Sequence, residues 1–281
     1  MPLEAKRSRR VAVAISEARR RPPIRRKNRR TVISMANQVD RPDFDELYRD
    51  ERTTEGLPTL TPWDIGGPQP VVQQLVAYGA VRGEVLDPGT GPGHHAIHYA
   101  SKGFRATGID ASAAAIERAK RNAEIAGVSV DFQVSDATKL EGFENRFDTV
   151  VDSAFYHVFQ DDEETQIQYM QALHRATKPG ARLFMFEFGR HNVNGLVFEG
   201  LPADNFERVL PAGGWRLDYL GTTTYQGNFS PETFAAISAQ AGPQYAERMK
   251  PLAERLQVVL PLLEKGRVNM PFWDVVATRL D

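Results

Sequence analysis

The feature that most constrains the fold is a glycine-rich turn between a short apolar strand and a helix. Residues Asp87–Gly93 read Asp-Pro-Gly-Thr-Gly-Pro-Gly, and they separate the predicted strand Glu84–Asp87 from the predicted helix His94–Ser101. Glycines at this spacing let the backbone pass close to a ligand at positive φ. The turn is neither a dinucleotide fingerprint nor a P-loop, because His94 stands where the third glycine belongs and no Gly-Lys-Ser/Thr sequence ends it.

Short apolar strands and amphipathic helices alternate along much of the chain. Helices are predicted at Pro70–Gly79, His94–Ser101, after the N-cap Ser112, at Glu163–Thr177 and at Ser230–Ala241. Strands are predicted at Glu84–Asp87, Ala106–Asp110, Val128–Val134, Phe147–Asp152, Leu183–Phe188, Trp215–Tyr225 and Phe272–Arg279. This alternation predicts an α/β fold with a doubly wound, mostly parallel sheet and helices on both faces. Ligands of such sheets bind beyond the carboxyl ends of the strands, where the strand order reverses.

Two of these segments have patterns that predict which side is buried. In the helix after Ser112 the buried stripe is expected to consist of Ile116, Ala119, Ala123 and Ala126. In Val128–Val134 the apolar residues alternate strictly with polar ones, which predicts a strand near the sheet edge with one face exposed to water.

Acidic residues recur at the predicted strand ends. Asp110, Asp136 and Asp152 each follow an apolar stretch, so all three should lie on the carboxyl rim of the sheet. A carboxylate at Asp110 can accept both hydroxyls of a ribose, and one at Asp136 can accept from an adenine amino group. No Lys or Arg lies between Asp87 and Lys102, which disfavours a phosphate ligand. S-adenosylmethionine, a cationic, ribose-bearing and phosphate-free cofactor, fits this rim.

The ordered motifs resemble those of class I S-adenosylmethionine-dependent methyltransferases. They are Asp87–Gly93, Ile109-Asp110-Ala111, Ser135-Asp136-Ala137 and Lys178-Pro179-Gly180. The segments Leu60–Pro70 and Phe147–His157 are more narrowly similar to the thiopurine methyltransferase-like group, and within it to bacterial heterocyclic toxin methyltransferases, which methylate hydroxyquinolones and related heteroaromatics. The resemblance implies seven strands with the last one antiparallel, and a role in detoxification. The chain departs from the group at His94-His95, where an acid or Asn is expected.

The residue pattern and the resemblance together give a set of candidate site residues. Cofactor contacts are expected from Trp63, Gln69, Asp87, Gly89, Gly91, Gly93, Asp110, Ala111, Asp136, Ala137, Asp152 and Ser153. Acceptor contacts are expected from Phe44, Tyr48, Phe155, Tyr156 and His191. His157 follows the fourth predicted strand, and its neutral imidazole could accept a proton from a hydroxyl nucleophile or could simply shape the pocket. No metal is expected, because the acids 161–164 match no metal-ligand pattern and better complement the start of the next helix.

The basic residues are concentrated at the amino terminus. Residues 1–30 hold twelve Lys or Arg and two acids, which leaves 23 basic and 34 acidic residues in 31–281. Residues 1–34 should therefore be a disordered extension. They could be a nucleic-acid or membrane arm, an organelle-targeting peptide, or a translated upstream stretch with Met35 as the real start; the last reading is preferred. Residues 35–281 are expected to form a single methyltransferase domain.

The alternatives in function are a nicotinamide-dependent oxidoreductase and an RNA methyltransferase or RNA-binding protein that uses the basic arm. The incomplete fingerprint disfavours the first, and the acidic body disfavours the second. Cysteine is absent, which excludes disulfides and a catalytic thiol. No apolar run approaches the roughly 18 residues of a membrane span, and no secretory signal pattern is present. We therefore expect a cytoplasmic monomer or homodimer that acts on a small molecule, with a helical insertion at 244–264 covering the acceptor pocket.

Overall fold

The computed structural model describes residues 44–49, 61–229, 250, 253–259, 261, 263 and 266–281. Three predictions lie outside these residues. They are the disordered extension 1–34, the start at Met35 and a helix expected at Ser230–Ala241.

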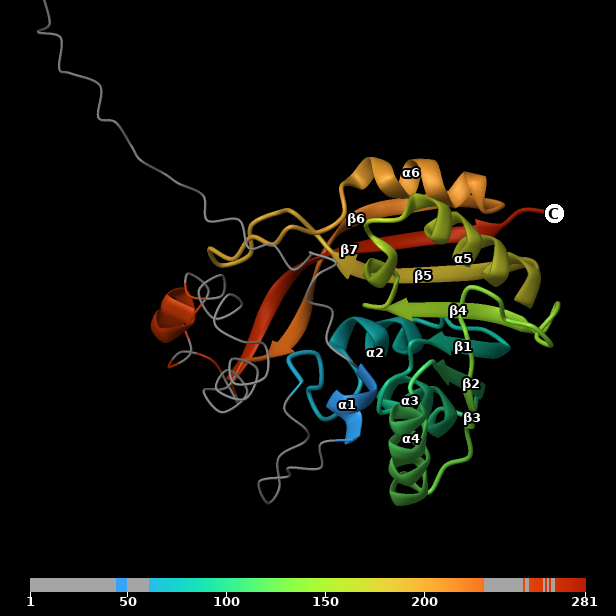
Figure 1. Ribbon diagram of the computed structural model, residues 1–281, viewed down its shortest axis with the longest axis horizontal. Helices are drawn as coiled ribbons and strands as arrows, with labels where there is room; N and C mark the ends of the chain where they lie inside the picture. The colour runs from blue at the N-terminus through green and yellow to red at the C-terminus, as the bar shows by residue number, and fades with distance from the viewer. Residues whose placement is uncertain are drawn as a thin grey trace, which may run out of the picture. The chain divides into compact units, whose positions relative to one another are not determined.

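The described chain forms a seven-stranded sheet in the order β3-β2-β1-β4-β5-β7-β6, which can be followed from bottom to top in Figure 1. The strands are β1 (Glu84–Pro88), β2 (Arg105–Asp110), β3 (Asp131–Val134), β4 (Phe147–Ser153), β5 (Thr177–Phe188), β6 (Trp215–Asn228) and β7 (Arg267–Arg279). Strands β1 to β5 pair in parallel, and β7 runs antiparallel between β5 and β6. The predicted sheet, including its antiparallel last strand, is confirmed.

The helices of the described chain cover both faces of this sheet. They are α1 (Phe44–Arg49), α2 (Pro70–Ala77), α3 (His94–Ser101), α4 (Ala113–Ala126), α5 (Glu163–Ala176) and α6 (Ala203–Ala212), with a 3-10 turn η2 (Tyr156–Phe159). Alternate strand residues point to opposite faces. Val85 and Val151 pack in the core cluster with α2, α3 and α4, whereas Leu86 and Val150 pack in the cluster with α5 and α6.

The boundaries of some elements differ from those predicted. Strand β3 begins only at Asp131, and Val134 is 56% exposed because it is the last residue of an edge strand. Ala126 is exposed rather than buried, since it ends α4. Strand β5 begins at Thr177 instead of Leu183, because the chain pairs with β4 through a shifted register on either side of Lys178-Pro179-Gly180.

Helix α6 was not predicted from the sequence. Pro202 precedes it and Pro211 lies inside it, so its local sequence reads as a loop. Its apolar face, Phe206, Val209 and Leu210, is buried against the sheet. Tertiary burial rather than local propensity therefore stabilises this helix.

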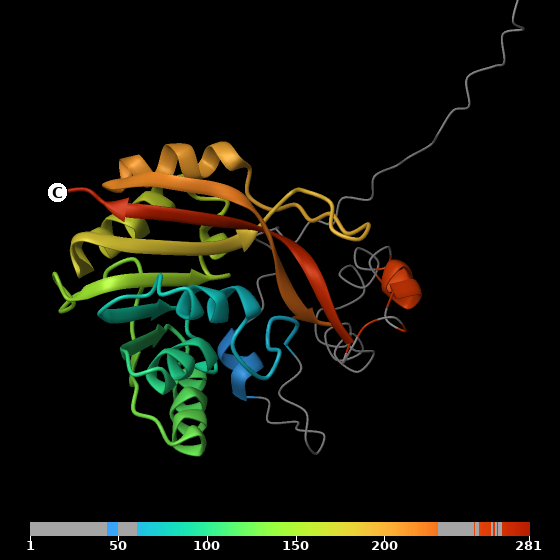
Figure 2. The ribbon, with the colours of Figure 1, turned by 180° about the vertical axis from the view of Figure 1, so that it is seen from behind.

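The segment Thr61–Gln69, here called the strap, covers the open edge of β6. Because β6 is an edge strand, one side of its backbone has no strand partner. The Gln69 side chain supplies one: its Nε2 donates to the Gln226 carbonyl at 2.8 Å, and its Oε1 accepts from the Gln226 N–H at 2.9 Å. The Asn228 N–H also donates to the Pro62 carbonyl at 2.6 Å. Strands β6 and β7 extend beyond the others as a curved ribbon (Figures 1 and 2), and the strap binds to it there.

Replacement of Gln69 by Ala should lower the free energy of unfolding by about 1–3 kcal/mol, because two backbone groups of Gln226 lose their partner. The matched control is Gln73→Ala, which removes an exposed amide that donates to the Pro68 carbonyl. This control should stay within about 0.5 kcal/mol of the wild type. Equal denaturant midpoints for the two variants would show that the strap is not held by Gln69.

Candidate active site

The glycine-rich turn lies where the strand order reverses, between β1 and β4. Gly89, Gly91 and Gly93 have φ angles of 65°, 52° and 82°, a region that side chains with a Cβ rarely adopt. A Cβ on Gly89 would overlap the ring of Phe155, and one on Gly91 would lie 2.7 Å from the Tyr48 hydroxyl. The glycines therefore let two aromatic side chains, Phe155 and Tyr48, approach the backbone closely.

Asp87 begins the turn and is fully buried. Its Oδ2 accepts from the Thr90 hydroxyl at 2.6 Å and from the Ala96 N–H at 3.2 Å. Burial raises the pKa of Asp87 to about 7, although these hydrogen bonds oppose the shift. A cationic group bound beside it would favour the ionised carboxylate and lower this pKa.

Asp110 ends β2 and closes the turn from the other side. Its Oδ2 accepts from the Gly91 N–H at 3.0 Å, and its Oδ1 accepts from the Ser112 N–H at 2.9 Å. Burial raises the pKa of Asp110, and the backbone donors counteract the shift. A carboxylate has about four acceptor positions, so Asp110 keeps acceptor capacity for a ribose hydroxyl beyond its backbone donors.

The other predicted rim residues have different surroundings. Asp136 is exposed and accepts from the Thr138 hydroxyl and from Lys139 Nζ at 3.0 Å, whereas the neighbouring Ala137 is buried. Ala111 is exposed directly after Asp110. Ser153, at the end of β4, shares a hydrogen bond of 3.1 Å with the Tyr225 hydroxyl.

The strap and α1 cover the turn through polar contacts that the sequence did not reveal. Asp64 is 2% exposed, and its Oδ1 lies 3.0 Å from His94 Nε2, while Oδ2 lies 3.6 Å from Arg118 Nη2. Burial acts to raise the pKa of Asp64, but the hydrogen bonds from His94 and the Gly66 N–H and the nearby Arg118 guanidinium lower it overall. The departure of His94-His95 from the family pattern was the sequence feature that could have indicated a contact between this segment and the strap.

His95 and Gln69 link α3 to the strap. Burial lowers the pKa of His95 to about 3, so its ring is neutral. The ring nitrogen Nε2 can therefore accept from the Gln69 N–H at 3.3 Å. The Nε2 and Oε1 atoms of Gln69 both hydrogen-bond to the backbone of Gln226, so this residue holds the strap against β6. The predicted contact between Gln69 and the cofactor stays a prediction.

Tyr48, predicted to contact the acceptor, and Trp63, predicted to contact the cofactor, lie together at the glycine turn. The Trp63 Nε1 donates to the Tyr48 hydroxyl at 3.3 Å, and that hydroxyl faces Gly91. Tyr48 thus lies at the glycine turn expected for the cofactor. The helix that carries it is anchored on α4, because Asp45 Oδ1 accepts from the Ser112 hydroxyl at 2.7 Å. Phe44 begins the same helix, and its side chain lies outside the described residues.

The turn after β4 is organised by Asp152, which is fully buried. Its Oδ1 accepts from the N–H groups of Phe155 and Tyr156, and its Oδ2 accepts from the Tyr169 hydroxyl at 2.8 Å. Ala154 has a φ of 62°, an uncommon conformation for a residue with a Cβ. The predicted cofactor residue Asp152 thus uses its oxygens to fix a turn, which places Phe155 on Gly89.

The predicted acceptor residues separate into two groups. Phe155 lies at the turn, and its ring packs edge-on against Phe159. Tyr156 points the other way: it is 1% exposed, and its hydroxyl donates to Asn205 of α6 at 3.0 Å. This place in the core differs from the predicted acceptor pocket, because adjacent residues of a tight turn face opposite sides. His191 lies beside β6, with its Nε2 3.2 Å from the Thr223 carbonyl.

His157 is paired with a residue that the sequence analysis missed. Its Nδ1 lies 3.1 Å from Oε2 of Glu187, which is fully buried near the end of β5. The imidazole edge also packs on Phe188, with ring centroids 5.1 Å apart. An acid within the apolar run Leu183–Phe188 was the signal that could have identified Glu187.

Part of the predicted 244–264 helix can be placed. Residues 253–259 are helical, and Leu256 is buried in the same cluster as Tyr225, Phe229 and Met270 of the extended ribbon. Arg255 Nη2 donates to the Asn194 carbonyl at 3.0 Å, in the connection after β5. That this segment covers an acceptor pocket stays a prediction.

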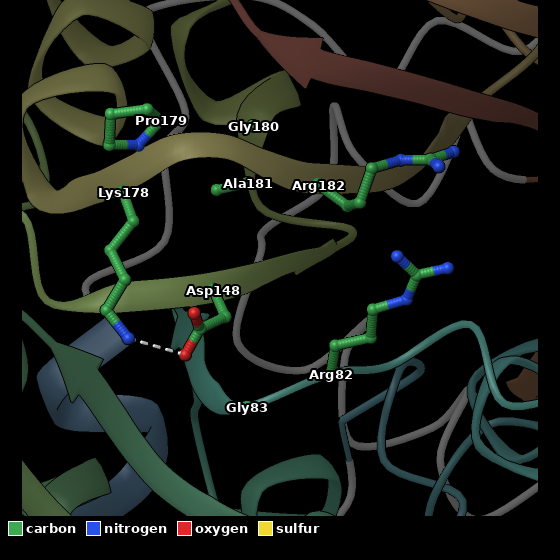
Figure 3. A pocket seen from close by; sticks show the side chains of 8 residues that line it. All are labelled: Arg82, Gly83, Asp148, Lys178, Pro179, Gly180, Ala181 and Arg182. Carbon is green, nitrogen blue, oxygen red and sulfur yellow. Dashed lines mark hydrogen bonds and ion pairs between the residues drawn. The ribbon is translucent and has the colours of Figure 1, made fainter.

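A surface cavity of about 160 Å³ lies at the amino ends of the central strands, away from the glycine turn; Figure 3 shows the residues that line it. It is lined by residues at the starts of β4 and β5, and Figure 3 shows Lys178 pointing to Asp148, with Nζ 2.7 Å from Oδ2. The amino ends of the strands meet here, whereas ligands of doubly wound sheets bind at the carboxyl ends. We therefore assign the active site to the glycine turn and not to this cavity.

Within the described residues, no group of three or more His, Cys, Asp or Glu is placed to hold a metal ion. No described helix is long and apolar enough to cross a membrane.

Comparisons with known proteins identify relatives of this chain. A family model described as a methyltransferase domain matches residues 85–180. A 2-heptyl-1-hydroxyquinolin-4(1H)-one methyltransferase of Mycobacteroides abscessus is 37% identical over 148 residues, which are 52% of this chain and 64% of that protein. An uncharacterized methyltransferase of Schizosaccharomyces pombe is 31% identical over 119 residues, which are 42% of this chain and 80% of that protein.

A solved structure described as "Conversion of a Disulfide Bond into a Thioacetal Group during Echinomycin Biosynthesis" superposes with a TM-score of 0.60 and 27% sequence identity. It covers 78% of this chain and 84% of that chain. The fold and the turn thus define a class I S-adenosylmethionine-dependent methyltransferase, and the chain belongs to this family. The match to the Mycobacteroides enzyme spans 64% of its length, less than two thirds.

Binding of S-adenosylmethionine should strengthen by about fivefold between pH 6 and pH 7, because the Asp87 carboxyl with a pKa of about 7 must ionise beside a cation. The sign follows from the raised pKa: protonated Asp87 predominates below pH 7, and the favourable negative charge appears only as the pH rises. Calorimetric titrations at several pH values measure this slope.

The control for that titration is Asp87→Asn, which keeps the size of the side chain and cannot ionise. Its affinity should be flat across the same pH interval. A slope that persists in this variant would assign the titration to another group, such as Asp110.

Proposed function

We propose that the protein transfers a methyl group from S-adenosylmethionine to the oxygen, or to a nitrogen or sulfur, of a small heteroaromatic acceptor such as a hydroxyquinolone. The observation that supports this most is the joint position of the glycine turn and Asp110, whose carboxylate accepts from the Gly91 N–H at 3.0 Å at the switch point of the sheet. The 37% identity to a hydroxyquinolone methyltransferase supports the acceptor class.

The residues present fit this cofactor. Asp110 would hold the ribose hydroxyls, Asp87 would favour the cationic end, and Asp136 with Ala137 would lie at the adenine end. Tyr48 and Trp63 would cover the cofactor from the side of the strap. When bound, the cofactor supplies a methyl group on a sulfonium sulfur, and the protein has to align the acceptor with it and exclude water.

The acceptor side of the rim is aromatic. Tyr225 and Phe272 stack with centroids 4.3 Å apart, and Phe188 lies 4.6 Å from Phe272. Tyr225 and Phe272 are themselves buried, so they would pack beneath a flat apolar acceptor near Ser153, and the half-buried rings of Phe155 and Phe188 would contact it. Segment 253–259 would close this side and set the size of the acceptor.

A role in RNA methylation through residues 1–34 is the second reading, and no feature of the described residues favours it. The acidic balance of residues 31–281 opposes binding to a polyanion. A cytoplasmic location, a monomeric or dimeric state and a role in detoxification remain predictions for this protein.

The experiment that tests the function is a methyl-transfer screen with hydroxyquinolones, phenols, aromatic thiols and halides as acceptors. Turnover should be highest with a hydroxyquinolone or a related heteroaromatic hydroxyl compound. Methylation of RNA but of none of these small molecules would reverse the order of the two readings.

Asp110→Asn should weaken binding of S-adenosylmethionine by about 1–3 kcal/mol, because one charged acceptor of the ribose hydroxyls becomes neutral. Asp161→Asn, a substitution of an exposed acid beyond η2, should leave the affinity unchanged. Calorimetry on both folded variants gives the comparison. Equal affinities of the two variants for S-adenosylmethionine would show that Asp110 does not contact the cofactor.

A further inference from the structure

The sheet end near His157 contains two fully buried carboxyl groups, Asp152 and Glu187, on neighbouring strands. Burying one charge is costly, and burying two like charges side by side costs more. Burial and the nearby Glu187 raise the pKa of Asp152 well above its ordinary value, although Tyr169 and two backbone donors oppose the shift. Of the two carboxyl groups, Glu187 is the member that lies against an imidazole.

The contacts of Glu187 are few. Its Oε2 lies 3.1 Å from His157 Nδ1, and its Oε1 is buried with no hydrogen-bond partner among the described residues. The groups that face it are Asp152 of β4, Tyr156 of η2, Tyr169 of α5 and Tyr225 of β6. None of these is a cation, so the imidazole is the group that can compensate the carboxylate.

We propose that Glu187 is a positioning residue, which holds His157 in the Nδ1–H tautomer so that Nε2 serves as the general base for the methyl acceptor. This inference rests on the proposed function, since it assigns the base of that reaction. A carboxylate that accepts from one ring nitrogen orients the ring and leaves the lone pair on the other nitrogen. His157 is 27% exposed and follows Phe155, which touches the glycine turn, by two residues.

The proton transfer balances within this arrangement. The O–H bond of the acceptor breaks with its electron pair left on oxygen, and the proton passes to Nε2 of His157. The Glu187 carboxylate stabilises the imidazolium that results, and the exposed edge of the ring then returns the proton to solvent. An acceptor that is already ionised needs none of these steps, which provides a selective test.

The first measurement is the His157 tautomer, read from the ¹⁵N shifts of its ring and assigned by their loss in His157→Gln. The wild type should show the Nδ1–H form, and Glu187→Leu, which removes the acceptor without changing the apolar packing much, should lose it. An Nε2–H ring in the wild type would overturn the proposal. This readout needs no turnover, so it stays decisive even if the proposed acceptor class is wrong.

The second measurement uses a series of hydroxyquinolines of graded acidity. Glu187→Gln should lower kcat by about 10²-fold for weakly acidic acceptors and by less than about threefold for ionised ones. The Kd for S-adenosylmethionine should not change. The control Glu199→Gln makes the same substitution at an exposed site after β5 and should behave as the wild type.

The third measurement separates positioning from a structural effect. In a His157→Gln background, Glu187→Gln should cause no further loss with weakly acidic acceptors, because the two residues act as a unit. Three outcomes would overturn the proposal. They are an equal loss of kcat for all acceptors, additive losses of kcat in the double variant, and wild-type turnover that is confined to ionised acceptors.

Discussion

The buried carboxyl group of Asp152 is the constraint on which the active site depends most. It accepts hydrogen bonds from two backbone N–H groups of the turn after β4 and from the Tyr169 hydroxyl of α5. One side chain therefore links a strand, a turn and a helix. The direction of that turn decides that Phe155 meets Gly89 and that Tyr156 enters the core. Because of this hydrogen-bonded turn, the adjacent residues Phe155 and Tyr156 lie in different places, one at the glycine turn and the other in the core.

The strap has a comparable role on the opposite side of the rim. It is bound to the α3 and α4 side through Asp64 and to β6 through Gln69, so it connects the glycine turn with the far end of the sheet. These contacts are buried and polar, and they require defined partners rather than general apolar packing. The proposed cofactor site next to Tyr48 and the proposed acceptor site near Tyr225 would therefore be linked through a single short segment.

Much of this arrangement follows from the sequence because it depends on local patterns. The glycine turn, the acids at the ends of β2 and β4 and the N-cap Ser112 are each defined by neighbours within a few residues. The partners of Gln69 and Glu187 lie 157 and 30 residues away, respectively, and no local pattern encodes such pairs. Helix α6 was missed for a related reason, since its prolines argue against a helix and only the sheet beneath it provides the compensation.

The ribbon of β6 and β7 has a consequence for how such an enzyme can change its acceptor. Their pairing runs from Trp215 with Arg279 to Asn228 with Arg267, and it ends on the rim where the acceptor is proposed to bind. In general, doubling the length of a flexible connection between two paired strand ends costs only about 0.6 kcal/mol. Insertions at this hairpin can therefore diversify the recognition surface during evolution while the cofactor half of the domain keeps its inherited geometry.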